Sequence, residues 1–93
     1  MSTLIEEALN LLGKRVLDKV TSFQGIVTSI SFDLYGCVQV LVHPGYDEKE
    51  NKLMDLNWFD FARLRIINDI PVMKQPNFKI DKGPSEKPTF NKK

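Results

Sequence analysis

The chain contains few of the residues that most catalytic and metal centres use. Its 93 residues include one cysteine, Cys37, and one histidine, His43, which excludes an intrachain disulfide and leaves too few ligands for a zinc site within one copy. If both residues lie in one strand, about 20 Å separates them, so they cannot form a catalytic dyad within one copy. We therefore expect a protein that is not an enzyme and uses no metal or cofactor, with Cys37 buried for structural reasons and His43 at the surface.

The sequence also lacks the patterns of phosphate loops, membrane spans and secretion signals. None of its five glycines belongs to a dinucleotide-binding or Walker motif, and no run approaches the roughly 20 apolar residues of a membrane span. The N-terminus has no basic segment, and Glu6 and Glu7 interrupt its apolar residues, so no signal peptide is expected. The length allows one domain. The single cysteine and the absence of these patterns predict a cytoplasmic protein without membrane contact.

Charge is nearly balanced over the whole chain but unevenly distributed. The net charge is +1, and residues 79–93 hold five lysines against Asp81 and Glu86, so this tail carries +3 and the remaining residues carry −2. A slightly acidic body binds a nucleic-acid backbone poorly, which makes nucleic acid a less favoured partner. We expect the basic tail, residues 79–93, to be disordered and solvated.

Apolar residues alternate with polar ones between Lys14 and Ile67, and glycines and charged residues separate the alternating runs. This period of two is typical of half-buried antiparallel strands and predicts five of them, at residues 15–21, 26–33, 37–43, 56–61 and 64–67. A solvated charged loop at residues 46–52 and a 3₁₀ turn near Arg63 are expected between strands. The fold expected is mainly β, with residues 14–68 forming a small five-stranded antiparallel Src-homology-3-like barrel.

The alternation also assigns side chains to faces. In the first predicted strand, Asp18 shares a face with Val16 and Val20, while Leu17 and Lys19 lie on the opposite face. In the second predicted strand, the apolar face consists of Ile26, Thr28, Ile30 and Phe32. Gly25, just before this strand, is expected to supply a positive φ or a close approach of two backbones.

Segments with apolar surface flank the predicted barrel. Residues 1–13 predict a short amphipathic helix that starts with a capping box of Thr3 and Glu6 and ends at Gly13. Residues 69–78 predict an extended arm, because prolines break regular structure among apolar residues. A barrel of about 55 residues is near the lower limit for a self-sufficient core, so we expect the helix or the arm to pack on another copy in a closed homo-oligomer.

Several aromatic, basic and polar residues fall at the predicted turns and corners, where small barrels bind their ligands. They are Phe23, Gln24, Asp33, Tyr35, Trp58, Arg63 and Arg65. An aromatic ring and an arginine together hold a base and a phosphate, by stacking and by bidentate hydrogen bonds, so we take these seven as candidate ligand-binding residues. For Phe23 and Trp58 we favour a role in the core or a subunit interface, where large aromatics are most needed. For Tyr35 the two roles are balanced.

Parts of the chain resemble a diffuse group of small phage and prophage proteins. Members of that group show D-x-V-T-G-F-x-G-x-V, then G-C-x-Q, then a W-x-D segment, and the corresponding stretches here are Val16–Ser29, Tyr35–Val40 and Trp58–Leu64. Pro71–Met73 also matches, so the resemblance covers roughly residues 15–73. Ser22 stands where glycine is frequent, a departure that should alter only the turn.

The resemblance implies a viral accessory protein and supplies no catalytic residue. We expect a homo-oligomer in the host cytoplasm that binds a small anionic, nucleotide-type ligand or a host protein and thereby counters host defence. Two alternatives remain open at this point. One is a small barrel that binds nucleic acid, whose affinity would fall steeply with salt. The other is a structural or assembly component of the virion.

Overall fold

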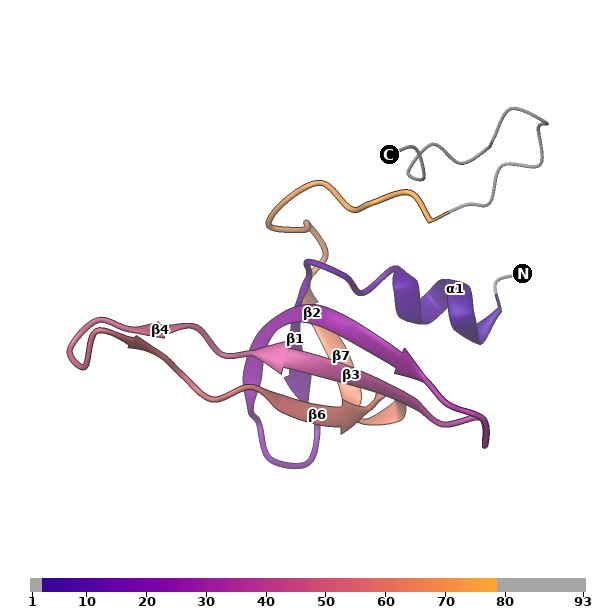
Figure 1. The fold of residues 1–93 in the computed structure, drawn as a ribbon, viewed down its shortest axis with the longest axis horizontal. Helices are drawn as coiled ribbons and strands as arrows, with labels where there is room; N and C mark the ends of the chain where they lie inside the picture. The colour runs from indigo at the N-terminus through magenta and orange to yellow at the C-terminus, as the bar shows by residue number, and fades with distance from the viewer. Residues whose placement is uncertain (1–2, 79–93) are drawn as a thin grey trace, which may run out of the picture.

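The computed structural model describes residues 3–78, and within them the protein is mainly β (Figure 1). An antiparallel sheet of five strands has the order β6-β3-β2-β1-β7. These strands are β1 (Arg15–Asp18), β2 (Gln24–Phe32), β3 (Val38–His43), β6 (Asn57–Asp60) and β7 (Leu64–Asn68). The expected disorder of the basic tail concerns residues outside this range.

The sheet is open, so the predicted barrel is not closed. In the described residues β6 pairs with β3 alone and β7 pairs with β1 alone, which leaves both as edge strands. A 3₁₀ turn, η1 (Phe61–Arg63), joins these two edges without a ladder between them. β2 is strongly curved and runs through both halves of the sheet, which brings the two edges toward each other (Figure 1).

β1 ends earlier than the sequence pattern predicts. Val16 and Asp18 are fully buried and Leu17 faces outward, in agreement with the predicted faces. The chain then turns, because the Ser22 N–H donates to the Asp18 carbonyl at 2.8 Å and β2 begins at residue 24. Val20 lies in this turn and is exposed, so its predicted place on the inner face is wrong.

The inward-facing residues of β2 change parity in mid-strand. Val27 is buried in the first half, and Ile30 packs against the core in the second half. Between them the register with β3 shifts from Val27 to Ser29, which leaves Thr28 as the extra residue of a β-bulge. Because one extra residue moves all following side chains to the other face, the predicted apolar face is wrong for Ile26 and Thr28.

The core lies between the inner face of the curved sheet and the chain that follows the helix. Its buried cluster consists of Leu11, Val16, Val27, Val40 and Val42. Half-buried side chains that pack around this cluster include Phe23, Phe59, Phe61, Leu64 and Ile66. Valine and aromatic side chains suit such a pleated inner face, and alternate residues of β3 and β6 supply them as the pattern predicts.

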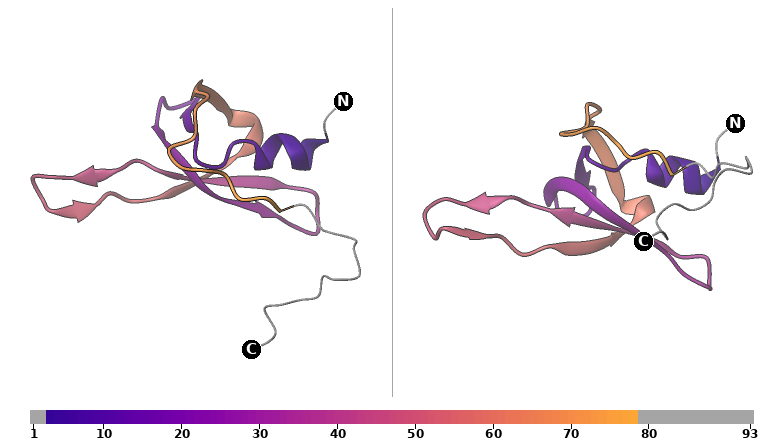
Figure 2. Two further views of the ribbon diagram at one scale, coloured as in Figure 1. Left: turned by 90° about the horizontal axis from the view of Figure 1, so that it is seen from above. Right: turned by 45° about the horizontal axis from the view of Figure 1, so that its top comes forward.

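A long hairpin projects from the sheet between β3 and β6 (Figure 2). In it β4 (Tyr46–Asp47) pairs with β5 (Lys52–Leu53), so the predicted loop at residues 46–52 contains a small second sheet. The side chain of Asp47 caps the turn by accepting from the backbone N–H groups of Lys49 and Glu50 at 3.0 and 3.3 Å. Local hydrogen bonds of this type stabilise a turn without burying it.

The helix and the arm lie beside each other on one side of the sheet (Figures 1 and 2). α1 (Leu4–Leu9) begins with the predicted capping box, in which the side chains of Thr3 and Glu6 each accept a backbone N–H of the other residue. After β7 the chain returns to the end of the helix, where the Val72 N–H donates to the Gly13 carbonyl at 2.8 Å. The Gln75 side chain then donates to the carbonyls of Asn10 and Leu12.

Candidate functional site

The corner between β1 and η1 is organised around a fully buried carboxylate. Asp18 is 0% exposed and accepts two hydrogen bonds from Arg63, at 2.8 Å from Nε and 2.6 Å from Nη2. Thr21 donates to the same carboxylate through its backbone N–H at 3.0 Å and through its hydroxyl at 2.5 Å. A bidentate arginine with two further donors satisfies a buried carboxylate, which therefore holds the turn and η1 together.

This environment shifts both ionisation equilibria toward the charged forms. The Arg63 hydrogen bonds hold the pKa of Asp18 well below its usual range, with a smaller contribution from Thr21, and they outweigh the opposing effect of burial. The same pairing raises the pKa of Arg63. A carboxylate that is already paired in this way is a poor general acid or base near neutral pH.

Arg63 is also packed from a second side. Its guanidinium carbon lies 5.3 Å from the centre of the Phe59 ring, within the range of a cation–π contact. Phe59 in turn lies against Phe23, with ring centres 5.3 Å apart. Two residues expected to hold a ligand, Phe23 and Arg63, thus contribute to the packing of the fold. For Phe23 this is the role favoured from the sequence.

The predicted site residues on the β2–β3 hairpin lie far from this corner. Gln24 begins β2 and Asp33 follows its last residue, so roughly 30 Å of strand separates them. Asp33 shapes the turn, because its Oδ1 accepts from the backbone N–H groups of Tyr35 and Cys37 at 3.0 and 2.9 Å. Tyr35 itself is highly exposed at the tip. The seven predicted residues therefore do not form one pocket.

Cys37 is exposed, which contradicts its expected burial. It lies one residue before β3 begins and so precedes the first buried residue of that strand, Val40. Residues 3–78 contain no group of three or more His, Cys, Asp or Glu side chains that could hold a metal ion.

Trp58 lies on the outer face of the sheet. It pairs with Leu41 of β3, while the neighbouring Phe59 points to the core. Asp60 is on the same outer face, and its carboxylate lies 3.5 Å from the side-chain nitrogen of Gln39. Trp58 therefore has a polar neighbour on one side and an apolar cross-strand neighbour on the other, and nearly half of its surface is exposed.

The two remaining candidates, Gln24 and Arg65, are brought into one row. Leu17 of β1 pairs with Gln24 of β2 on one side and with Arg65 of β7 on the other. All three side chains face away from the core, and both Gln24 and Arg65 are exposed. The row is therefore a second outer surface, on the other half of the sheet from Trp58.

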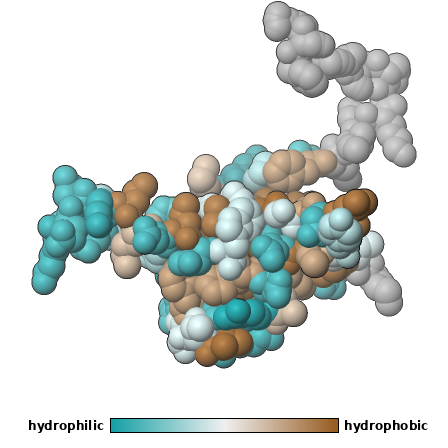
Figure 3. Space-filling model, turned by 60° about the horizontal axis from the view of Figure 1, so that its bottom comes forward, coloured by the Kyte–Doolittle hydropathy of each residue, from teal (hydrophilic) through white to brown (hydrophobic). Residues whose placement is uncertain are grey.

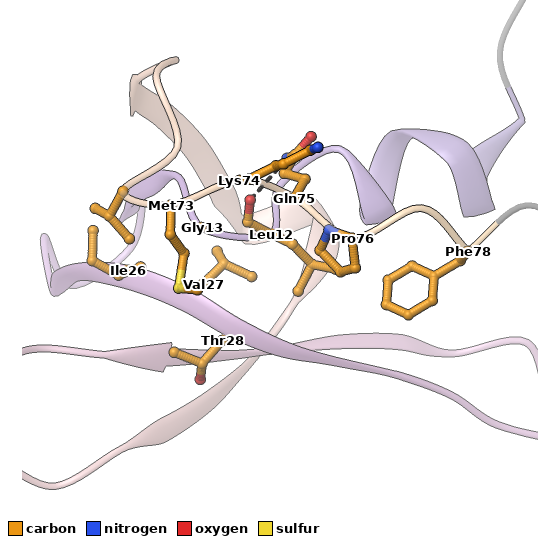
Figure 4. A pocket seen from close by; sticks show the side chains of 11 residues that line it. Leu12, Gly13, Ile26, Val27, Thr28, Met73, Lys74, Gln75, Pro76 and Phe78 are labelled. Atoms are coloured by element: carbon orange, nitrogen blue, oxygen red, sulfur yellow. Dashed lines mark hydrogen bonds between the residues drawn. The ribbon is translucent and has the colours of Figure 1, made fainter. Parts of the chain in front are cut away.

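A groove between the arm and β2 was not predicted from the sequence (Figure 4). It has a volume of about 310 Å³, and the arm lines one side of it while Leu12, Val27 and Thr28 line the other. Met73 points from the arm toward β2 (Figure 4). The apolar residues of the arm were the only sequence signal for this groove, and its position depends on the long-range hydrogen bonds of Gln75.

Comparison of the chain with models of protein families, with curated proteins and with solved structures finds no match. Within residues 3–78, no helix is both long enough and apolar enough to cross a membrane.

Proposed function

We propose that the protein is a non-enzymatic binding protein that works as a homo-oligomer, with copies that meet along the β6 edge of the sheet. The observation that carries this proposal is a strip of exposed apolar side chains that leads into this edge strand. We call it the β6 strip, and it consists of Leu53, Met54, Leu56 and Trp58.

The four side chains of the β6 strip are substantially exposed although they are large and apolar. Their exposed fractions are 65% for Leu53, 44% for Met54, 45% for Leu56 and 49% for Trp58. Scattered apolar side chains are normal on a protein surface, but four within residues 53–58 are more than scatter, and apolar side chains gathered in this way typically mark an interaction site. On the face shown in Figure 3 the far end of the hairpin is hydrophilic, which limits the apolar surface to the part of the hairpin nearer the sheet.

The backbone of β6 supports the same proposal. In the described residues β6 pairs on one side only, so its other side presents free N–H and C=O groups. Edge strands are commonly protected by shortness, charged side chains, proline or a bulge. β6 is short, but it contains neither lysine nor proline, and its one charged residue, Asp60, lies at its end and leaves the apolar Trp58 at its centre. A two-fold axis at Trp58 would pair β6 with β6 of a second copy and place the two tryptophans side by side on the outer face.

The ligand and the biological role are also proposals. From the resemblance to phage and prophage proteins, we propose that the protein binds a small anionic, nucleotide-type ligand or a host protein and thereby counters host defence. The mainly β fold with its open five-stranded sheet is compatible with a Src-homology-3-like topology, which we propose on the order of the strands and the 3₁₀ turn before the last of them. The commitment of Asp18 to Arg63 agrees with a binding role rather than acid–base catalysis.

Light scattering coupled to size exclusion tests the oligomer. At micromolar concentration the native chain should have at least twice the monomer mass of 10.7 kDa. Trp58→Ser should shift it to the monomer, because it removes the central apolar contact of the β6 strip. The matched control is Val20→Ser, which removes an exposed apolar side chain from the β1–β2 turn and should leave the mass unchanged. A native chain that is strictly monomeric would overturn the proposal.

A further inference from the structure

A group of cationic side chains surrounds Leu17 on the outer face of the sheet. We call this surface the Leu17 face, and its members are Arg15, Leu17, Lys19, Gln24 and Arg65. Leu17 pairs directly with Arg65 on β7 and with Gln24 on β2. Arg15 lies two residues before Leu17 in β1, so the two share a face. Lys19 is exposed and comes directly after β1, where its backbone N–H donates to the Arg63 carbonyl at 2.8 Å and keeps this residue beside the start of β7.

The strand spacing places these groups within reach of a single anion. Side chains directly opposite each other in an antiparallel ladder have Cβ atoms about 5 Å apart, and diagonal neighbours are about 7 to 8 Å apart. Arg65 is a direct neighbour of Leu17. Arg15 lies one step further along β1, across a register shift that pairs it with Asn68, and Lys19 follows the last pair, Asp18 with Leu64. Side chains as long as arginine and lysine easily converge across this distance. A phosphate above Leu17 could accept hydrogen bonds from all three.

The positive charge of the Leu17 face has no acidic partner in the described part of the chain. The ion pairs found there join Arg63 to Asp18 and Lys14 to Asp69, and none involves the cations of the Leu17 face. Asp18 is turned toward the core, and Asp69 lies 2.7 Å from the Lys14 ammonium. The other outward neighbours in these strands, Ile26, Ile67 and Asn68, are uncharged.

We infer that the Leu17 face is a binding site for the phosphate group of a small molecule. Arginine forms bidentate hydrogen bonds with phosphate oxygens, and Gln24 adds an amide donor from the opposite side. Leu17 and Ile26 are only half-buried, so an uncharged part of the ligand has apolar surface to contact beside the cations. A nucleic-acid backbone is disfavoured, because residues 1–78 carry a net charge of −2 and the cations form one local group.

This inference deepens the ligand part of the proposed function and rests on it, but it does not need the oligomer. All five residues of the Leu17 face come from one copy, and none belongs to the β6 strip. Light scattering on the same samples therefore separates the two ideas, since loss of ligand binding in an Arg65 variant should leave the mass unchanged.

Titration calorimetry with ADP on the full chain tests the site. The variants are Arg15→Gln and Arg65→Gln, and the matched control is Lys52→Gln, which removes a cation from the β4–β5 hairpin. Each arginine variant should weaken ADP binding about 10-fold or more, since a hydrogen bond to a charged group contributes about 1.5 to 3 kcal/mol. Lys52→Gln should bind as the native chain does. Arg65→Lys should bind with intermediate affinity, because it keeps the charge and loses the bidentate geometry.

Three further ligands distinguish the possible sources of binding. Inorganic phosphate should compete with ADP and adenosine should not, if the phosphate is what the Leu17 face recognises. The inference is overturned if adenosine binds as well as ADP, if ADP gives no heat, or if Lys52→Gln weakens binding as much as Arg65→Gln. A thymidine oligonucleotide that binds more tightly than ADP, with a steep loss of affinity from about 50 to 200 mM salt, would assign the face to nucleic acid instead.

Discussion

Gly25 is the position at which a single added methyl group should damage the fold most. It lies in β2, one residue before Ile26, which pairs with His43 of β3, and it is buried. A Cβ at this residue would lie 2.4 Å from the carbonyl oxygen of His43 and 2.7 Å from its carbonyl carbon, whereas ordinary contacts begin at 3.4 Å. The two backbones would have to separate by about 1 Å, and both belong to the sheet that carries the core. The sequence predicts either a positive φ or a close approach of two backbones at Gly25, and the structure supports the close approach.

The expected cost of Gly25→Ala follows from this geometry. Overpacking a well-packed interior typically costs about 1 to 3 kcal/mol, and the upper end applies here because the obstacle is backbone rather than a flexible side chain. A chain of this size has a free energy of unfolding of roughly 5 to 14 kcal/mol. A loss of about 3 kcal/mol should lower Tm by about 12 °C or more.

Urea denaturation of Gly25→Ala and Gly36→Ala measures this effect against a matched control. Gly36 has φ +88° and no atom within 4 Å of an added Cβ, so its substitution introduces only backbone strain of about 1 kcal/mol. Gly25→Ala should therefore lose clearly more free energy of unfolding than Gly36→Ala. Equal losses, or a Gly25→Ala protein as stable as the native chain, would refute the close approach of β2 and β3.

Three other predictions follow from the same structure. Ser22 has φ +70°, a region that favours glycine, so Ser22→Gly should raise the free energy of unfolding by about 0.5 to 1 kcal/mol in urea titrations, and a decrease would contradict this assignment. Asp18 has a depressed pKa in the folded state, so its contribution to stability is present above the ordinary pKa of about 4 and is lost as pH falls below it. Thermal unfolding should therefore show a steeper fall in Tm below pH 4 for the native chain than for Asp18→Asn, and parallel curves would argue against the Arg63 pairing. Cys37 is exposed, so its thiol should react with a thiol reagent in the native state as fast as in urea. A slower reaction in the native state would indicate that the thiol is buried, as the sequence predicts.

Local alternation predicted most of the sheet because it depends on neighbouring residues. The outward and inward residues of β3 and β6 agree with it, since these two strands pair with each other without a bulge. The bulge at Thr28 could not be predicted in this way, because Ile26, Val27 and Ile30 are all apolar and fit either face. The open edges depend on how far β2 bends, a property of the whole sheet that alternation does not report.

The candidate site was harder to predict because its chemistry depends on partners distant in sequence. The sequence makes Arg63 a ligand candidate, yet its Nε and Nη2 donate to Asp18, which precedes it by 45 residues and which local alternation does not place beside it. The sequence places Gln24 and Arg65 at separate corners, and only the strand order brings both beside Leu17. Arg15 and Lys19 are not ligand candidates from the sequence. Their alternation with Leu17 was visible, but their nearness to Arg65 required the pairing of β1 with β7.

The fluorescence of Trp58 tests the central claim most directly, because this residue is the single tryptophan of the chain and lies in the β6 strip. In one isolated copy it is 49% exposed. Self-association along β6 should bury it, so its emission maximum should shift to shorter wavelength as protein concentration rises, with a midpoint that agrees with the mass measured by light scattering. An emission maximum typical of a water-exposed tryptophan that stays constant from nanomolar to high micromolar concentration would contradict the proposed oligomer.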